Sequence, residues 1–264
     1  MRLCVIGSGS SGNVLYAEAG DARVLVDVGL SAKETARRLV DVGVDPASIT
    51  AVVLTHEHAD HAKGVSVFAR NYGVPVYTSS QTREACKFGR FEAKIDFVEI
   101  SSSDPFHIGK LEFYPFTVPH DAVDSFAFTL ESDRAKAAIV TDLGYITNLV
   151  AERVAGADVL ILESNHDVEM LKICPVYPWS LKQRVLSKHG HLSNDAVSDF
   201  LARDFDGKAE HVILAHLSKN TNHPHLARLN ALQALDARGS LFFRDAERRV
   251  KVADQDAPGE WIEL

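Results

Sequence analysis

The sequence has few cysteines, no long hydrophobic run and no excess of positive charge. Its three cysteines, Cys4, Cys86 and Cys174, are far apart and lack the paired spacing of a zinc–cysteine site, so we expect reduced and mostly buried thiols. No apolar stretch approaches the length of a membrane span, and the apolar residues after Arg2 are too few for a secretory signal. These absences predict a cytoplasmic protein that does not bind a membrane.

The net charge of −8 gives the chain no overall attraction to nucleic acid, so a nucleic-acid substrate would need a local basic surface. An apolar fraction of 46% in 264 residues is ordinary for a folded protein and suffices for a large core. Because no stretch has the composition of a linker, we predict a single domain over residues 1–264. The sequence leaves the oligomeric state open.

A glycine-rich stretch, GSGSSG from Gly7 to Gly12, matches the G-x-G-x-x-G pattern of dinucleotide-binding loops, and Asp27 follows at about the expected distance. That kind of loop must lead into a helix, because the helix N-terminus holds the pyrophosphate. Residues 14–26 instead have the pattern of a β-hairpin around a Gly20-Asp21 turn. The sequence therefore predicts a tight turn between two strands and argues against a nucleotide cofactor.

Strand and helix patterns alternate along the rest of the chain, which predicts an α/β architecture with helices covering sheets. Ser31 and Glu34 form a capping box at the start of a helix that Gly43 ends. Further strands are predicted over 51–55, 74–78, 95–100, 111–118, 157–164 and 211–216, with a hairpin over 125–144. Further helices are predicted over 61–73, 80–89, 165–173, 178–189, 194–204 and 224–237. The last predicted element is a hairpin at about 240–252.

The stretch THEHADH, residues 55–61, directly follows the predicted strand 51–55. It supplies three imidazoles and a carboxylate from one loop: His56, His58, Asp60 and His61. Nitrogen and oxygen ligands so close together suit zinc and similar divalent metals. The H-E-x-x-H spacing of a zincin helix does not fit, because Asp60 stands where its second histidine would be.

H-x-H-x-D-H after a hydrophobic strand resembles the signature of the metallo-β-lactamase superfamily. The other motifs of that family have counterparts here in the same order: Asp27 ending a strand, His120 in TVPHDAVDS, Asp142 in IVTDLG and His216 in ILAHLS. The resemblance spans residues 27–216 and implies a four-layer αββα sandwich. It also implies that Asp27 braces the metal loop.

The resemblance implies a centre of two divalent metal ions, zinc or manganese, with iron a third option. One ion would be held by His56, His58 and His120. The other would be held by Asp60, His61 and His216, with Asp142 bridging the two. In such a centre a bridging hydroxide attacks the substrate, and Asp60 is counted among the catalytic residues.

Two further residues resemble an acid pair found in the tRNase Z and phosphodiesterase branches of the superfamily. Glu163 ends a predicted strand in LILESNHD, and His191 precedes a helix that Ser193 is expected to cap in GHLSN. The histidine would protonate the leaving oxygen while the glutamate orients it. His166 competes with His191 for this role or for substrate binding, and we favour His191.

A basic run lies just before His191, containing Lys172, Lys182, Arg184 and Lys188. Such a run is ordinarily a solvated helix face, but beside a metal site Lys182, Arg184 and Lys188 could bind the phosphates of a nucleic acid. Tyr177 and Trp179 lie among these cations, where they could stack bases or belong to the core. In the opening loop, Ser10, Ser11 and Asn13 could offer donors to a substrate phosphate.

The motifs together resemble the YycJ/WalJ-like subgroup, which is associated with 5′→3′ exonuclease activity on DNA. This resemblance implies a dinuclear metal phosphodiesterase in which hydroxide attacks phosphorus and His191 is the general acid. One alternative is a glyoxalase II-like thioester hydrolase, which would leave Glu163 and His191 without a role. Another is a non-catalytic, metal-free binding scaffold. The native metal, the choice of DNA or RNA and the strand polarity stay open.

Overall fold

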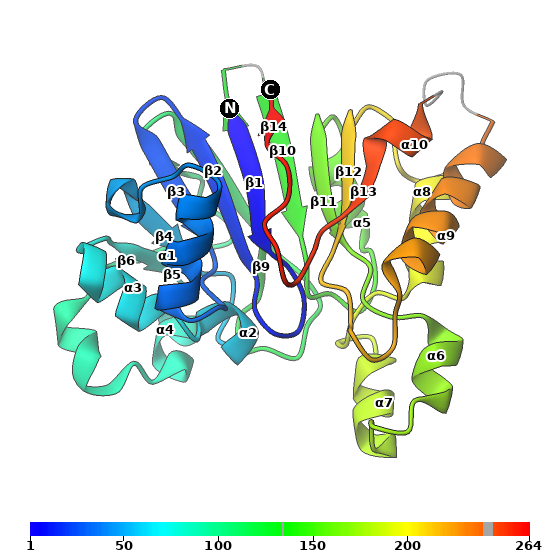
Figure 1. Ribbon diagram of the computed structural model, residues 1–264, viewed down its shortest axis with the longest axis horizontal. Coiled ribbons are helices and arrows are strands. Elements are labelled where there is room, and N and C mark those ends of the chain that lie inside the picture. The colour runs from blue at the N-terminus through cyan, green and yellow to red at the C-terminus, as the bar shows by residue number, and fades with distance from the viewer. Residues whose placement is uncertain (134, 240–244) are drawn as a thin grey trace. The chain divides into compact units, whose positions relative to one another are not determined.

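The computed structural model describes residues 1–264 apart from 134 and 240–244, and the described chain divides into two compact units (Figure 1). The first unit comprises Met1–Thr117, Ala122–Ala135 and Asp254–Leu264, and the second comprises Val118–Asp121 and Lys136–Ala253. The single domain over 1–264 stays a prediction. In the part of the chain that the structure describes, no helix is both long enough and apolar enough to cross a membrane.

The first unit is built on a seven-stranded sheet with the order β14-β1-β2-β3-β4-β5-β6. Its strands are β1 (Arg2–Gly7), β2 (Val14–Ala19), β3 (Ala22–Val26), β4 (Ala51–Val53), β5 (Val76–Thr78), β6 (Phe97–Glu99) and β14 (Ile262–Glu263). β2 and β3 form the predicted hairpin, so a strand does follow the glycine-rich loop. From β3 to β6 the strands are parallel, which brings their carboxyl ends to the same edge.

Helices α1 (Ala32–Asp41) and α3 (Val65–Tyr72) cover this sheet, with Leu39 and Phe68 fully buried in its core (Figure 1). The predicted cap is present, since Ser31 Oγ accepts a hydrogen bond from the Glu34 amide at 3.2 Å. The unit also contains η1 (Pro46–Ser48), α4 (Ser80–Cys86), η2 (Gly89–Lys94) and the antiparallel strands β7 (Phe106–Ile108), β8 (Leu111–Thr117) and β9 (Phe126–Ser132).

The helix predicted over 61–73 ends at Gly73 as predicted, but it is not a single continuous helix. The structure has a short α2 (Ala59–Ala62) followed by α3, with Gly64 between them. The Gly64 amide donates to the Val28 carbonyl at 2.7 Å, and a Cβ at Gly64 would approach the Leu30 carbonyl oxygen to 2.2 Å. This backbone contact with Val28 therefore interrupts residues 61–73, although their side-chain pattern alone predicts one continuous helix.

The second unit contains the parallel strands β10 (Ala135–Val140), β11 (Val159–Glu163), β12 (His211–Ala215) and β13 (Val250–Val252). Its helices are α5 (Asn148–Val154), α6 (Val168–Ile173), α7 (Trp179–Val185), α8 (Asn194–Arg203), α9 (Pro224–Ala237) and α10 (Ala246–Arg249). β11 is buried along its whole length, as expected for a parallel strand covered on both faces. Helices α8 and α9 pack against each other, and α9 also contacts β13.

The hairpin predicted at about 240–252 is wrong for its second half and lies outside the described residues for 240–244. Residues 246–249 form α10, and β13 pairs in parallel with β12. Arg228 of α9 donates to the Val250 carbonyl, which ties this last strand to the helix beside it. The cysteine prediction is confirmed: all three are free, Cys4 and Cys174 are buried, and burial raises the pKa of the Cys4 thiol to about 11.

Three predicted site residues share an uncommon backbone conformation. Asp27, Asp142 and His216 have φ angles of 62°, 60° and 56°. Each follows closely on the carboxyl end of a strand, namely β3, β10 and β12. The left-handed region is rare for residues other than glycine, although aspartate and histidine adopt it more often than most. Such outliers concentrate at functional sites. The shared conformation therefore indicates a functional site at the carboxyl ends of these strands.

Candidate metal centre and acid pair

In the first unit, the parallel strands β3 and β4 bring Asp27 and Thr55 together. The Asp27 carboxylate accepts hydrogen bonds from the Thr55 amide at 2.8 Å, from Thr55 Oγ1 at 3.0 Å and from His61 Nδ1 at 2.7 Å. All three residues are buried. Because Nδ1 of His61 donates to Asp27, its Nε2 is the nitrogen that can bind a metal.

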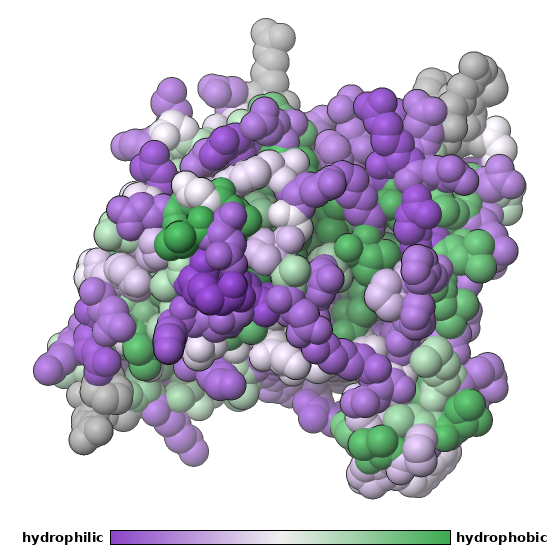
Figure 2. Space-filling view, viewed as in Figure 1, coloured by the Kyte–Doolittle hydropathy of each residue, from purple (hydrophilic) through white to green (hydrophobic). Residues whose placement is uncertain are grey.

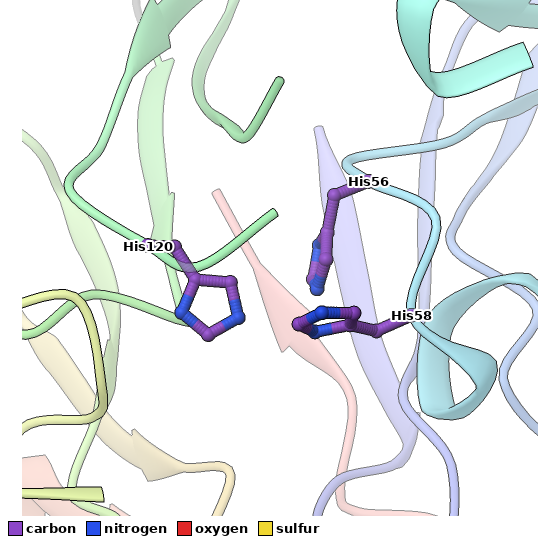
Figure 3. Close-up of side chains that lie close together, drawn as sticks. All are labelled: His56, His58 and His120. Atoms are coloured by element: carbon purple, nitrogen blue, oxygen red, sulfur yellow. The ribbon is translucent and has the colours of Figure 1, made fainter. Parts of the chain in front are cut away.

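The histidine loop begins where β4 ends and runs into α2. The rings of His56 and His58 lie 4.7 Å apart at 75°, and the rings of His56 and His61 lie 4.2 Å apart. Figure 3 shows His56 and His58 projecting from this loop, and it also labels His120, which follows β8 in the sequence and belongs to the second unit. His56 Nδ1 lies 2.9 Å from Thr55 Oγ1, which leaves Nε2 of His56 as its candidate ligand atom. The loop thus presents the imidazoles of THEHADH as one cluster.

The glycine-rich loop packs directly against the histidine loop. The Asn13 amide donates to the Asp60 carbonyl at 2.8 Å, and the Gly29 amide donates to the Asn13 carbonyl at 2.9 Å. Gly12 has a φ of 154°, and a Cβ there would come within 2.7 Å of the Gly29 backbone. The side-chain amide of Asn13 also lies 3.1 Å from His61 Nε2. Asn13 is therefore buried beside the histidine loop.

Of the other residues that we predicted to bind substrate in this loop, Ser10 is exposed, and Ser11 is exposed with its hydroxyl 3.3 Å from Gln255 Oε1. The Asn13 side chain is already committed, because its Oδ1 accepts a hydrogen bond from the Gly9 amide at 2.8 Å. These contacts favour a bracing role for Asn13 over contact with a phosphate. Binding of a substrate phosphate by Ser10 and Ser11 stays a prediction.

In the second unit, Asp142, Glu163 and His216 follow or end the parallel strands β10, β11 and β12, so they meet at one sheet edge. Ligand atoms of Asp142, Glu163, His191 and His216 all lie within 4.8 Å of one another. Nδ1 of His216 lies 3.4 Å from Asp142 Oδ1. Two carboxylates and two imidazoles therefore converge at this edge, and of these Asp142 and His216 are the predicted metal ligands, while Glu163 and His191 are the predicted acid pair.

Glu163 is the centre of this cluster and is fully buried. Its Oε1 accepts hydrogen bonds from Nδ1 of His191 at 2.8 Å and from Nδ1 of His216 at 2.7 Å. Its Oε2 accepts from the amides of Leu143 at 3.1 Å and Leu192 at 3.0 Å. Every donor that reaches Glu163 therefore favours its ionised form.

The electrostatics of the pair follow from these contacts. Burial alone raises the pKa of Glu163, but the charge of His191 and the hydrogen bonds from His191 and His216 outweigh it and hold the pKa at about 2. Burial also lowers the pKa of His191, but the nearby charge of Glu163 and its hydrogen bond prevail and raise it overall. Glu163 thus keeps the His191 imidazole oriented and favours its protonated form.

His120 is tied to the same region. Its Nδ1 donates to the Gly190 carbonyl at 3.1 Å, and its ring centre lies 5.2 Å from that of His191. Gly190 is needed for this approach, because a Cβ there would lie 2.2 Å from the Val185 carbonyl oxygen. A single peptide unit therefore carries the acceptor for His120 and leads into His191.

His166, the competing acid, is only 1% exposed, and burial lowers its pKa to about 4. Among the described residues, neither of its ring nitrogens has a hydrogen-bond partner. Its backbone carbonyl accepts from the Asn194 amide at 2.8 Å. A buried imidazole held neutral is a poor proton donor at neutral pH, so the geometry favours His191.

The predicted basic run lies on α6, α7 and the turn after them, and several of its cations are already engaged. Lys172 pairs with Glu169 at 2.7 Å, and the ammonium of Lys182 donates to the Lys172 carbonyl at 2.8 Å. Arg184 forms an ion pair with Asp121, the neighbour of His120. Lys188 is exposed on the turn before His191. Lys182 and Arg184 thus already have partners within the protein, which argues against a role for either side chain in binding phosphates.

Asn165 is a structural residue of this cluster that our sequence reasoning missed. Its side-chain amide donates to the His216 carbonyl at 2.9 Å, and its backbone amide donates to the Leu192 carbonyl at 2.9 Å. Its own carbonyl accepts from the Ser218 amide at 2.8 Å. Asn165 therefore links the loops that carry His191 and His216. The only signal in the sequence was an asparagine two positions after Glu163 at a strand end.

Comparison with known proteins places these features in context. Residues 22–217 match the β-lactamase superfamily domain. The chain is 36% identical over 241 residues to the exodeoxyribonuclease YycJ of Bacillus anthracis, covering 90% of each chain. It is 36% identical over 239 residues to the exodeoxyribonuclease WalJ of Streptococcus pneumoniae serotype 2, covering 89% of this chain and 88% of the relative.

Among solved structures, the metallo-β-lactamase fold protein YhfI from Bacillus subtilis matches 100% of this chain and 99% of its own, with a TM-score of 0.73 and 16% identity. At that level of identity the likeness concerns the fold alone. It confirms the predicted fold class, an α/β sandwich of two sheets flanked by helices.

Proposed function

Since the chain belongs to the β-lactamase superfamily and is similar to the YycJ/WalJ exodeoxyribonucleases, we propose that it is a metal-dependent phosphodiesterase acting on nucleic acid. DNA is the proposed substrate, degraded from its 5′ end. The observation that carries the proposal is the Glu163–His191 pair, a buried carboxylate that orients an imidazole beside Asp142 and His216. An acid so placed serves an alkoxide leaving group, which phosphodiester cleavage produces.

Three of the predicted ligand histidines have Nδ1 engaged and Nε2 available, which suits metal binding. Nδ1 is engaged in His61 by Asp27, in His120 by the Gly190 carbonyl and in His216 by Glu163. Metal-binding histidines characteristically donate their other ring nitrogen in this way, which fixes the tautomer and the direction of the ligand atom. The same arrangement in two separate units supports these histidines as ligands.

We assign the ligands as the superfamily motifs imply. His56, His58 and His120 would hold one ion, Asp60, His61 and His216 the other, and Asp142 would contact both. When bound, two divalent ions lower the pKa of a coordinated water and neutralise the charge that develops on the phosphoryl oxygens. Zinc or manganese suits this set of five imidazoles and two carboxylates, and iron would fit the same set.

The chain's own residues supply the rest of the reaction. His191 donates a proton from Nε2 to the leaving oxygen, since its Nδ1 is held by Glu163. Glu163 stabilises the charged imidazole before transfer and prevents it from rotating. Asp27 holds the His61 ring and the Thr55 backbone, so that the histidine loop keeps its conformation when substrate binds.

The deciding experiment is a panel of end-labelled single- and double-stranded DNA and RNA, incubated with the purified protein and added manganese or zinc. We expect a product ladder that grows from the 5′ end of DNA. Turnover of acyl-glutathione without cleavage of any nucleic acid would instead indicate a thioester hydrolase. A purified protein that holds no metal and cleaves neither substrate would indicate a binding scaffold.

A further inference from the structure

The segment from Val168 to His189, which we call the arm, projects from the second unit as α6, α7 and the turns around them (Figure 1). It exposes four large apolar side chains within fourteen residues: Ile173 at 78%, Val176 at 68%, Trp179 at 66% and Leu186 at 42%. Figure 2 shows hydrophobic surface where α6 and α7 lie. Single exposed apolar residues are ordinary, whereas a group of them indicates a binding surface.

The charge of the arm is opposite to that of the chain. It contains four lysine and arginine residues and one glutamate, a net charge of +3, while the whole chain carries −8. The exposed cation Lys188 lies on the turn before His191, and the exposed Lys172 lies at the end of α6. A surface that is both basic and apolar complements a ligand with anionic groups and flat apolar faces, which an unpaired nucleic-acid strand has.

The arm is anchored to the loops of two site histidines. At its middle, the Tyr177 hydroxyl lies 3.3 Å from Ser218 Oγ, in the loop that follows His216. At its end, the Val185 carbonyl accepts from the His191 amide at 3.1 Å. Val185 lies six positions after Trp179 in α7, about 9 Å along the helix at 1.5 Å per residue. A nucleic-acid strand advances about 3.4 Å per base, so this distance corresponds to about three nucleotides between Trp179 and the Val185 carbonyl that holds the His191 amide.

We infer that the arm is the docking surface for the substrate strand, with an unpaired base stacked on Trp179 and the backbone phosphates near Lys188. This inference rests on the proposed function, because it gives the strand entering the acid site a defined path. The apolar residues Ile173 and Val176 extend the platform beside the indole. Base–aromatic stacking tolerates any sequence, so this surface suits an enzyme that degrades a strand without sequence preference.

The first test compares Trp179→Ala with Leu229→Ala, which removes an exposed apolar side chain from α9. For a single-stranded oligonucleotide, Trp179→Ala should raise KM roughly 5- to 100-fold, the loss expected for one stacked base. Its turnover of bis(p-nitrophenyl) phosphate, which is too small to reach the arm, should equal that of the wild type. Leu229→Ala should change neither. An unaltered KM in Trp179→Ala overturns the inference.

The second test reads stacking without turnover. In a Trp261→Phe background, Trp179 is the only tryptophan, and an oligonucleotide should quench its fluorescence. Moving an abasic site along the oligonucleotide should weaken binding at one position in the wild type and at none in Trp179→Ala. An absence of quenching overturns the inference, whether or not the protein cleaves phosphodiesters. If the wild type cleaves neither substrate, the proposed function fails, and this titration still decides the role of the arm.

Two other occupants would also overturn the inference. If the arm binds a second copy, Trp179→Ala should change the mass in light scattering while leaving oligonucleotide affinity intact. If it binds a lipid surface, phosphatidylserine vesicles should sediment the wild type and not Trp179→Ala, again with intact oligonucleotide affinity. Both measurements use the same variant and the full chain.

Discussion

Glu163 Oε1 lies 2.8 Å from His191 Nδ1, and the carboxylate that makes this contact is fully buried. The same oxygen also accepts from His216 Nδ1 at 2.7 Å. One carboxylate therefore orients both the proposed acid and a proposed metal ligand. The two partners should respond differently to substitution, since only one of the two histidines would hold metal.

Replacing His191 with alanine should lower the cleavage rate of DNA by about 10²- to 10⁴-fold, the usual contribution of a general acid. The rate with bis(p-nitrophenyl) phosphate should fall far less, because nitrophenolate leaves without a proton. Bound metal, measured by elemental analysis, should equal that of the wild type. His189→Ala, an exposed histidine of the same turn, is the matched control and should be silent. Equal losses on both substrates would contradict the acid role.

Replacing Glu163 with glutamine should lower both activity and stability, in contrast to His191→Ala. The amide nitrogen would face either the amides of Leu143 and Leu192 or the two imidazole N–H groups, and it can accept from neither. Each buried donor left without a partner costs about 1–3 kcal/mol. Thermal unfolding should show the loss, while Glu169→Gln, an exposed glutamate of α6, should unfold like the wild type. A stable variant with normal metal content would argue against the bracing of His216.

Replacing Asp27 with asparagine tests the brace of the histidine loop. Asparagine tolerates the backbone φ of 62°, so the change removes the charge and one acceptor without straining the turn. Loss of such an outer partner typically weakens metal affinity by about 10- to 100-fold, which a competing chelator would measure. Asp133→Asn is the control, because Asp133 has a φ of 53° in an exposed turn. Equal metal affinity in the two variants would contradict the role of Asp27 in supporting the metal ligands.

The local parts of the fold were predictable because short-range pattern determines them. The hairpin of β2 and β3, helix α9 over 224–237 and the Ser193 cap of α8 follow from side-chain periodicity and capping residues close together in sequence. The histidine cluster was equally predictable, since its imidazoles come from one loop after one buried strand. These features need no knowledge of which strands become neighbours.

Other features depended on contacts between distant residues. The hydrogen bond from His216 to Glu163 follows from the parallel register of β11 and β12. This register pairs Glu163 with Ala215, so the next residue, His216, lies at the same edge of the sheet as Glu163. The break at Gly64 follows from its hydrogen bond to Val28. The bracing role of Asn13 depends on Gly29, where a Cβ would lie 1.7 Å from the Asp60 carbonyl oxygen. Sequence pattern carries none of these pairings.

An ion pair away from the site gives a prediction for stability against pH. Arg38 has a buried side chain that donates to the carbonyls of Ile6 and Gln255, and its Nε donates to Glu34 Oε1 at 2.7 Å. The hydrogen bonds from Arg37 and Arg38 lower the pKa of Glu34 to about 2. A depressed carboxylate pKa means that the stabilisation is fully present above the unfolded-state value of about 4.3 and is lost as pH falls through about 2.

Glu34→Gln should therefore lower the free energy of unfolding at pH 7 by about 1 kcal/mol, a value kept small because Glu34 is partly exposed to solvent. The difference from the wild type should shrink as pH falls below 4 and disappear below about pH 2, where both proteins carry a neutral group. Denaturant unfolding at several pH values measures it, with Glu84→Gln, an exposed glutamate of α4, as the control. A difference that stayed constant with pH would mean that the loss comes from altered packing rather than from the charge on Glu34.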